Sequence, residues 1–314
     1  MRCLVTGAAG FIGSTLSERL LADGHQVSGI DSFVEYYPRG IKERNLAAAL
    51  KHKNYNFIDG DLVNLDLNSL LASTELVFHQ AAQAGVRASW GNYFESYIHN
   101  NIRATQKLLE AARQSKALQK LVFASSSSVY GNAESSPTLE SSATCPVSPY
   151  GVTKLASEHL MSLYAIELGV PTVSLRYFTV FGPRQRPDMA FNRFIRAALK
   201  GEEITLYGDG EQSRDFTYVD DIVTANVLAA EHGRAGDVFN IGGGPHATVN
   251  EVLALLESEI GRLNIKRLER QQGDARHTCA DISRARERLG FSPKVALRDG
   301  LCAEISWLKS ELSA

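Results

Sequence analysis

Residues 6–13 read Thr6-Gly7-Ala8-Ala9-Gly10-Phe11-Ile12-Gly13, with a glycine at every third position. The apolar run that precedes them, 2–6, is typical of a buried strand, and the apolar residues of 11–22 recur at helical spacing. A strand, a glycine turn and a helix in this order allow a pyrophosphate to approach the backbone and the helix N-terminus closely. We therefore expect a dinucleotide site at this turn, formed by Gly7, Gly10, Phe11, Ile12 and Gly13.

Around this turn, the first two-thirds of the chain alternates short apolar runs with helical patterns, which favours a parallel sheet covered by helices. The expected strands are 2–6, 26–31, 55–58, 76–79, 120–125 and 172–177, and the expected helices are 11–22, 101–116 and 150–168. After about residue 178 the pattern becomes less regular, with isolated helices at 190–200 and 248–261. We predict an α/β fold: a Rossmann-type doubly wound parallel sheet over 1–177, and a smaller mixed α/β substrate-binding lobe over 178–314. The two lobes are expected to interleave around 215–242.

The composition argues against several classes of function. The formal net charge is −2, whereas a nucleic-acid partner usually requires a clear basic excess. The sequence holds no apolar run near the roughly 20 residues that span a bilayer, and a strand pattern begins at Arg2, so we expect neither membrane association nor a targeting segment. Cys3, Cys145, Cys279 and Cys302 are far apart, and the histidines show no metal-ligand spacing. We therefore expect no disulfide framework, no metal site and a cytoplasmic location.

The ends of the next strands indicate which dinucleotide binds. Asp31 ends the second expected strand, where a carboxylate suits the ribose hydroxyls of NAD and repels the 2′-phosphate of NADP. Arg39 stands nearby and could accommodate that phosphate, although a solvated loop arginine is the simpler interpretation. Asp61 and Leu62 follow the third strand and could flank the adenine, or Asp61 could cap the loop. Small or polar residues that leave room for the cofactor follow the fourth strand: Ala81, Ala82 and Gln83.

Tyr150 and Lys154 are spaced i, i+4 and so lie on one face of the expected helix. A lysine ammonium beside the tyrosine hydroxyl would lower the pKa of the phenol. The phenolate could then take a proton from a sugar hydroxyl while hydride leaves for the nicotinamide. By itself this pair could be an ordinary surface pair. However, the serine run 125–128 ends the preceding strand at the sheet edge where ligands bind, although such a run could also be a polar turn.

Together these motifs resemble the extended short-chain dehydrogenase/reductase family of nucleotide-sugar enzymes over essentially the whole chain. The resemblance implies NAD as cofactor, Tyr150 as base, Lys154 as its supporting lysine and Ser126 as the catalytic Ser/Thr. It also implies that Asn101 supports the active site on the cofactor side. A homodimer through the helices of 91–116 and 150–168 is a further implication, although the apolar faces of these helices could instead be core.

The segment 175–190 closely resembles UDP-glucuronate 4-epimerases, and Thr179 stands where UDP-galactose-type 4-epimerases usually carry asparagine. The 4,6-dehydratases of this family have an Asp-Glu pair where this chain has Ser127 and Ser128, which argues against that reaction. We expect Ser127, Ser128 and Thr179 to bind a C6 carboxylate and hold it near the ring plane, which disfavours loss of CO2. Arg186 could pair with the same carboxylate, or it could bind the diphosphate.

The nucleotide end of the substrate is expected to contact a set of arginines. Arg214 resembles a diphosphate-binding arginine of the family, Arg193 could contact the diphosphate or the ribose, and Arg87 is a weaker candidate. Asp274 and Arg276 belong to a segment that resembles a second nucleotide-binding loop. The division of roles between them and their neighbours Arg270 and Gln271 stays open.

The function expected from these residues is NAD-dependent C4 epimerisation of a UDP-sugar, from UDP-glucuronate to UDP-galacturonate through a 4-keto intermediate. The alternatives are a UDP-glucose or UDP-N-acetylglucosamine 4-epimerase, a UDP-glucuronate decarboxylase and, from another class, a non-catalytic NAD-binding protein.

Overall fold

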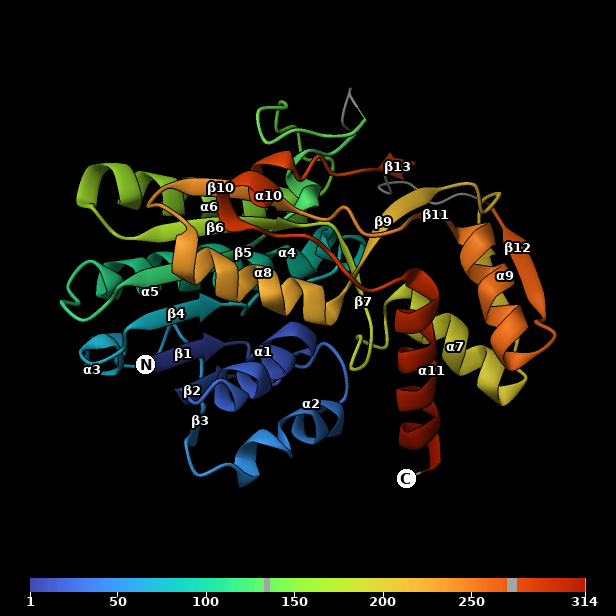
Figure 1. Ribbon diagram of the computed structural model, residues 1–314, viewed down its shortest axis with the longest axis horizontal. Helices are drawn as coiled ribbons and strands as arrows, with labels where there is room; N and C mark the ends of the chain where they lie inside the picture. Colours follow the sequence, from blue (N-terminus) through green and yellow to red (C-terminus); the bar gives the residue numbers. More distant parts are fainter. Residues whose placement is uncertain (133–135, 270–275, 314) are drawn as a thin grey trace.

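The computed structural model describes residues 1–132, 136–269 and 276–313. A seven-stranded sheet with the strand order β10-β6-β5-β4-β1-β2-β3 runs through the molecule, and every neighbouring pair is parallel (Figure 1). Six strands lie where the sequence predicted them: β1 (Arg2–Thr6), β2 (Gln26–Asp31), β3 (Tyr55–Asp59), β4 (Leu76–His79), β5 (Lys120–Ser126) and β6 (Thr172–Tyr177). The strand order reverses between β1 and β4, which confirms the predicted doubly wound α/β fold and places the ligand-binding crevice at that point.

The seventh strand comes from the part of the chain assigned to the second lobe. β10 (Asp237–Ile241) pairs in parallel with β6, and the helix before it, α8 (Val219–His232), packs on the same sheet. The chain therefore returns to the large sheet after residue 178. The division at residue 177 stays a prediction, and residues 219–241 belong structurally with the first lobe.

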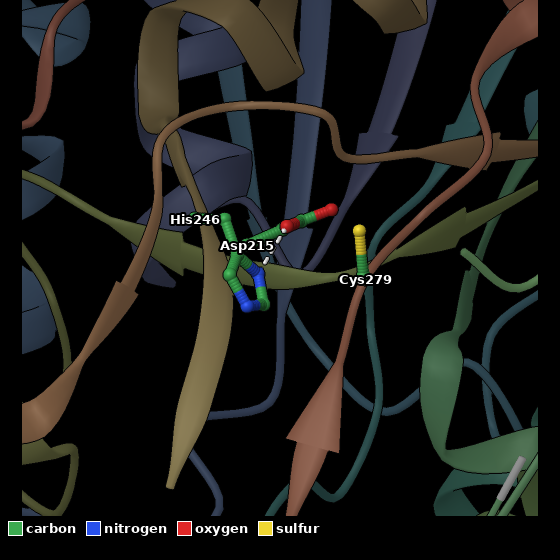
Figure 2. A group of neighbouring side chains, drawn as sticks. All are labelled: Asp215, His246 and Cys279. Carbon is green, nitrogen blue, oxygen red and sulfur yellow. Dashed lines mark hydrogen bonds and ion pairs between the residues drawn. The ribbon is translucent and has the colours of Figure 1, made fainter. Parts of the chain in front are cut away.

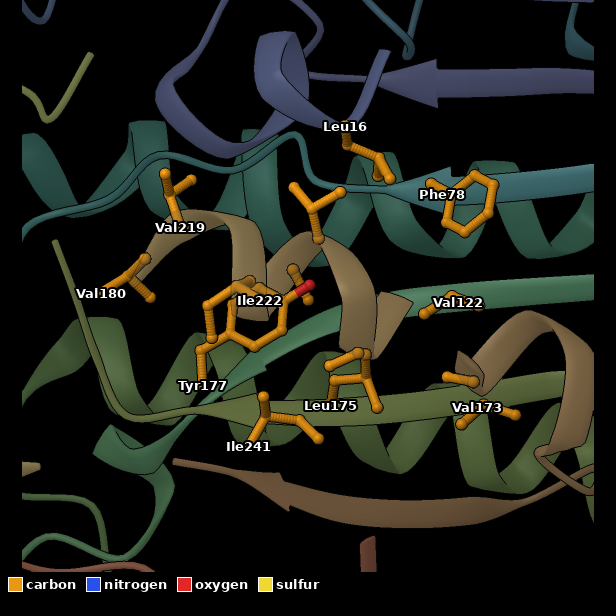
Figure 3. Close-up of a cluster of buried hydrophobic side chains, with 14 of the residues drawn as sticks. Leu16, Phe78, Val122, Val173, Leu175, Tyr177, Val180, Val219, Ile222 and Ile241 are labelled. Carbon is orange, nitrogen blue, oxygen red and sulfur yellow. The ribbon is translucent and has the colours of Figure 1, made fainter. Parts of the chain in front are cut away.

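Helices cover both faces of the large sheet. One face is covered by α1 (Phe11–Ala22), α8 and α10 (Ser283–Leu289), and the other by α3 (Leu67–Leu71), α5 (Ala104–Ala112) and α6 (Pro149–Leu168). Figure 3 shows the core on the first face, where Leu16 and Ile222 lie over Phe78, Val122 and Leu175 of the strands. These side chains are fully buried, so they supply the hydrophobic free energy that holds α1, and with it the glycine turn, against the sheet.

Two local features of α6 and its neighbour shape the site. α6 begins where the Ser148 side chain accepts a hydrogen bond from Gly151 N at 3.1 Å, with Pro149 in the first turn, and ends at Gly169, whose φ is +69°. The expected continuous helix 101–116 is wrong in detail. The structure has α4 (Phe94–Tyr97), then the π-helix η4 (Ile98–Arg103), then α5. A π-turn holds an extra residue, and such turns often occur at functional sites.

The second lobe lies beside the carboxyl end of the large sheet, on the right of Figure 1. β9 (Ser213–Tyr218) pairs with β7 (Thr179–Phe181), β11 (His246–Thr248) and β13 (His277–Thr278), and β8 (Ile204–Tyr207) pairs with β12 (Ile265–Leu268). Its core of Phe181, Phe191, Ile195, Leu256 and Leu301 joins α7 (Ala190–Lys200), α9 (Val249–Ile260) and α11 (Leu297–Ser313).

The remaining elements are short and lie mostly in the connections. They are α2 (Arg39–Leu46) and the 3₁₀ turns η1 (Ala49–Lys51), η2 (Arg87–Ser89), η3 (Gly91–Tyr93) and η5 (Ser127–Val129). Among the described residues, the helices are too short or too polar for any of them to cross a bilayer.

Candidate functional site

The glycine turn after β1 is shaped by close backbone contacts. Gly7 has φ of +69°, and a Cβ added there would lie 2.7 Å from Ala81 N. A Cβ added at Gly13 would lie 2.1 Å from the Gly7 carbonyl oxygen, which is far inside van der Waals contact. Only glycine fits at these two positions, because the first helical turn packs directly on the loop. The turn therefore leaves an open cradle beside the N-terminus of α1.

A cavity lies over this cradle, at the point where the strand order reverses. With the exception of Asn101, every residue predicted to bind the cofactor lines it: Gly7, Gly10, Phe11, Ile12, Gly13, Asp31, Asp61, Leu62, Ala81, Ala82, Gln83, Tyr150 and Lys154. The cradle and the acidic residue at its far end fit a dinucleotide, because they offer free space and helix amides to a pyrophosphate and a carboxylate to a ribose.

Asp31 is held in place by the backbone and by a lysine that the sequence analysis missed. Its oxygens accept hydrogen bonds from Ala9 N at 3.1 Å and Phe33 N at 2.8 Å, and Lys42 Nζ lies 3.3 Å from Oδ1. Lys42 is buried and lines the same cavity, whereas Arg39 is exposed on the surface, where it forms ion pairs with other carboxylates. The cation beside Asp31 is therefore Lys42 and not Arg39.

Asp61 caps its loop, which is one of the two interpretations made from the sequence, and its contact with the adenine stays a prediction. Asp61 accepts the capping hydrogen bond from Val63 N at 2.8 Å, and it also lines the cavity. His99 Nε2, from the π-helix, lies 2.7 Å from Asp61 Oδ2. Burial acts to raise the pKa of Asp61, but the hydrogen bonds from His99 and Val63 outweigh it, so the pKa lies below its ordinary value.

Tyr150 and Lys154 both face the cavity from the first two turns of α6. Lys154 is buried, and its Nζ donates a hydrogen bond to the Ala124 carbonyl of β5 at 2.7 Å. Burial lowers the pKa of Lys154 to about 7. The pKa of Tyr150 is raised by burial, and the groups that oppose this rise are the hydrogen-bonded Ser126 and the positive charge of Arg186. The lowering of the Tyr150 pKa by Lys154 stays a prediction.

Two buried side chains from α4 and the π-helix position the loop after β4. Asn101 accepts a hydrogen bond from Gln83 N at 2.7 Å and donates to Thr153 of α6 at 2.9 Å. Asn101 thus ties the cavity wall to α6 and does not itself line the cavity. Tyr97, which the sequence analysis missed, packs its ring edge-on to Tyr150 with centroids 6.3 Å apart and donates to the Gly85 carbonyl at 2.7 Å.

The serine run bends away from β5 into the short turn η5. Ser126 Oγ accepts a hydrogen bond from Ser128 N at 3.1 Å, so Ser126 faces the turn as well as Tyr150. Thr179 begins β7 beside Phe216 of β9. Within the described residues, Ser127, Ser128 and Thr179 line neither the cofactor cavity nor the one beside it, so their contact with a sugar stays a prediction.

A second cavity of about 600 Å³ adjoins the first. Five of the arginines predicted to bind substrate line it: Arg87, Arg186, Arg193, Arg214 and Arg276. Such a cluster is complementary to a diphosphate, because guanidinium groups bind phosphate oxygens in pairs of hydrogen bonds. Arg186 and Tyr36 line both cavities, so the cavities meet at these two residues.

The arginines come from separate segments and are held by different partners. Arg214 donates to the carbonyls of Ser213 at 2.8 Å and of Arg276 at 3.0 Å. Arg87 lies 5.1 Å from the centre of the Tyr207 ring, in cation–π geometry. Asp274, with Arg270 and Gln271, lies outside the described residues.

Asp215, His246 and Cys279 lie close together, as Figure 2 shows, with their potential ligand atoms within 4.8 Å of one another. The oxygens of Asp215 are already engaged: they accept hydrogen bonds from Ala280 N at 2.6 Å and Gly243 N at 3.3 Å, and His246 Nδ1 lies at 3.0 Å. We interpret this group as a structural hub that fastens β9 to its neighbours and so fixes the backbone beside Arg214.

Comparison with known proteins agrees with this arrangement. The chain is 47% identical over 314 residues to the uncharacterized UDP-glucose epimerase YtcB of Bacillus subtilis, covering 99% of this chain and 98% of that one. It is 37% identical over 316 residues to UDP-glucuronate 4-epimerase of Thermodesulfobacterium geofontis, covering 98% and 96%. The crystal structure of UDP-glucuronic acid 4-epimerase from Bacillus cereus in complex with UDP-glucuronic acid and NAD matches with a TM-score of 0.96, at 45% identity, over 99% of this chain and 100% of that one.

The family assignment follows from the match to a family model that describes the NAD dependent epimerase/dehydratase family and covers residues 3–242. That range includes the glycine turn, the serine run and α6, so the resemblance found from the motifs is confirmed. This chain belongs to the NAD dependent epimerase/dehydratase family.

Proposed function

We propose that this chain catalyses the NAD-dependent C4 epimerisation of UDP-glucuronate to UDP-galacturonate. The observation that carries the proposal is the position of Arg186, which lines both cavities and whose charge acts on Tyr150. A sugar that reaches Tyr150 from the arginine-lined cavity must pass this guanidinium. A cation there suits a C6 carboxylate, whereas a neutral hexose has no need of one. The Bacillus cereus complex with UDP-glucuronic acid supports the same substrate.

The proposed mechanism gives each residue a separate task. NAD, when bound, supplies the acceptor and donor of hydride at C4. Tyr150 removes the proton of the C4 hydroxyl, helped by its hydrogen bond with Ser126 and by the charge of Arg186, both of which favour the phenolate. The arginines hold the nucleotide while the 4-keto sugar turns its other face to the cofactor. Tyr150 then returns the proton, so the cycle has no net oxidation.

Lys154 completes the catalytic helix as a buried donor fixed to β5. Its pKa of about 7 allows the ammonium and amine forms to exchange near neutral pH, so that Lys154 can take up or release a proton close to the active site. The binding of a C6 carboxylate by Ser127, Ser128 and Thr179 remains part of the proposal, as does the protection that this gives against loss of CO2.

The experiment that tests the function is a product assay with three substrates. UDP-glucuronate, UDP-glucose and UDP-N-acetylglucosamine are each incubated with the NAD-loaded enzyme, and the C4 epimer is followed by proton NMR. We expect UDP-galacturonate to form with the highest kcat/KM and without release of CO2. Faster turnover of UDP-glucose would favour the alternative that the Bacillus subtilis relative suggests, and a UDP-pentose with CO2 would identify a decarboxylase.

The homodimer and the cytoplasmic location are also proposals. Large apolar side chains are exposed on α6 and before α4: Leu163 (52%), Ile166 (76%), Trp90 (57%) and Tyr93 (72%). An exposed apolar face of this kind is typical of a protein interface. We propose that it pairs with the same face of a second copy, and that the chain acts in the cytoplasm, where its thiols stay reduced.

A further inference from the structure

The point where the two cavities meet holds a small cluster of Arg186, Asp188 and Tyr36, and the proposed mechanism uses only the first of these three residues. Arg186 donates two hydrogen bonds to Asp188, from Nε at 3.0 Å and from Nη2 at 2.9 Å. Tyr36 donates from its hydroxyl to the same carboxylate at 3.2 Å, and the Arg186 guanidinium lies 5.8 Å from the centre of the Tyr36 ring. Tyr36 comes from the loop after β2, whereas Arg186 and Asp188 come from the loop after β7 in the second lobe. The cluster therefore joins the two sides of the site.

The loop that carries Arg186 has a rigid backbone. The amide side chain of Gln185 is buried, donating to the Val180 carbonyl at 3.0 Å and accepting from Asn192 N at 2.9 Å. At the start of the loop, Glu304 accepts a hydrogen bond from Gly182 N at 2.8 Å. Because the backbone is fixed in this way, the direction in which the Arg186 guanidinium points depends mainly on the partners of its side chain.

Asp188 determines which edge of the guanidinium is available. An arginine has five N–H donors in one plane, and Asp188 engages two of them along one edge. The three remaining donors, one on Nη2 and two on Nη1, point along the other edges of the same plane. The Arg186 side chain is only 21% exposed, and its charge acts on Tyr150. Arg186 and Tyr150 both line the cofactor cavity, so a guanidinium that is paired with Asp188 borders the same space as the proposed base.

We propose that Asp188, steadied by the Tyr36 hydroxyl, is a specificity-determining residue that orients Arg186 toward the C6 carboxylate of the sugar. The inference rests on the proposed function, since it takes the substrate to be a uronate. Asp188 engages one edge of the guanidinium in the same paired geometry that a sugar carboxylate would adopt on the other edge. Without Asp188, Arg186 keeps its charge but loses its fixed direction, so the enzyme loses discrimination between a uronate and a neutral hexose.

The test compares Asp188→Asn with the wild-type enzyme on two substrates. Asparagine keeps the size of the side chain but loses the charge and one of the two oxygens that accept hydrogen bonds from Arg186. We expect the ratio of kcat/KM for UDP-glucuronate to that for UDP-glucose to fall about tenfold or more, mainly through KM, while turnover of UDP-glucose changes less than about twofold. Tyr36→Phe removes only the hydroxyl and should shift the ratio in the same direction by a smaller factor.

Glu18→Gln provides the matched control. It breaks the ion pair between Arg184 and Glu18, which also joins this loop to the first lobe, at 2.8 Å, but away from Arg186. We expect it to leave the substrate ratio unchanged. An equal loss on both substrates in Asp188→Asn would overturn the proposal and reduce Asp188 to support of the loop. A rise in the ratio would also overturn it, because Asp188 would then compete with the substrate for Arg186.

The dissociation constants of both sugar nucleotides, measured by calorimetry on the NAD-loaded Tyr150→Phe enzyme with and without Asp188→Asn, separate this inference from the proposed function. We expect the added Asp188→Asn change to weaken binding of UDP-glucuronate more than that of UDP-glucose. If the wild-type enzyme does not epimerise UDP-glucuronate, the proposed function fails, but this binding comparison still decides the role of Asp188.

Discussion

The cofactor cavity and the arginine-lined cavity beside it are built from different kinds of chemistry. The first is shaped by backbone, with glycines so tightly packed that an added Cβ at Gly13 would lie 2.1 Å from a carbonyl oxygen. The second is shaped by long charged side chains from separate segments of the chain. The glycines of the first cavity leave no room for an added side chain. Ligand binding in the second cavity is instead sensitive to the loss of a positive charge. The two cavities should therefore lose ligand affinity in response to different substitutions.

The largest effect is expected at Tyr150, the proposed base, which lines the cofactor cavity. Tyr150→Phe removes the group that carries the proton, and we expect kcat to fall by about 10²–10⁴-fold. Neither cavity changes shape, so NAD content and KM should stay close to the wild-type values. Steady-state kinetics with NMR detection of the epimer measures this. If the variant kept more than a tenth of the activity, another group would have to carry the proton.

The second-largest effect is expected from a steric change that alters the cofactor cavity alone. Gly13→Ala places a methyl group against the Gly7 carbonyl, and overpacking of this kind costs about 1–3 kcal/mol. We expect the affinity for NAD to fall by roughly tenfold or more, seen as a lower NAD content after purification and a weaker NAD titration. Gly40→Ala in α2 is the matched control, because its added Cβ would be 3.7 Å from the nearest side-chain atom and should leave NAD binding intact. Full NAD content in Gly13→Ala would contradict this account of the turn.

The third effect is expected from the removal of one positive charge from the arginine-lined cavity alone. Arg214→Met keeps most of the aliphatic stem and removes the guanidinium, and a hydrogen bond to a charged group contributes about 1.5–3 kcal/mol. We expect KM for the UDP-sugar to rise by roughly 10–100-fold, while the NAD content stays unchanged. The exposed Arg262, in the loop after α9, provides the control as Arg262→Met, which should affect neither quantity. Loss of NAD from Arg214→Met would mean that the two cavities are not independent.

The smallest effect on turnover is expected at Glu304, behind the loop that carries Arg186. Burial raises the pKa of Glu304 from 4.5 to about 8. The folded state therefore binds more protons than the unfolded state between these values, and this contribution to stability is lost as the pH rises through about 8. Glu304→Gln has no proton to lose and still accepts from Gly182 N, so kcat should change less than about twofold. Thermal unfolding from pH 5 to 9 should show the wild-type Tm falling relative to that of the variant; parallel curves would refute the assignment.

Much of the fold and of the first cavity could be predicted from the sequence, because both depend on local patterns. Strands β1 to β6 are short apolar runs, and the glycine turn requires a fixed spacing that is visible in the chain. β10 was not among the expected strands, although interleaving around 215–242 was expected, because its position depends on a crossover through α8 and not on its own residues. The π-helix η4 was missed for a similar reason: residues 98–103 have a helical pattern, and only packing distinguishes a π-turn from an α-turn.

The arginines of the second cavity were predicted from the sequence, but their positions and their hydrogen-bond partners were not. Family resemblance pointed to the arginines, whereas the contacts of Tyr36 and Asp188 with Arg186 depend on how separate parts of the chain pack. Lys42 beside Asp31, in the first cavity, was missed for the same reason. The role of Lys154 was predicted from its spacing to Tyr150, but spacing gives the helix face only. It does not show that the Ala124 carbonyl engages the ammonium.

The late position of β10 in the chain has a consequence for how the protein is made. β6 leaves the ribosome before its outer neighbour exists, because on the order of 60 further residues, several seconds of synthesis, separate the two strands. During that interval the outer edge of β6 presents unpaired N–H and C=O groups, which can pair with a strand of another chain. This edge therefore stays exposed to wrong pairing until residue 241 emerges and the last strand joins the sheet.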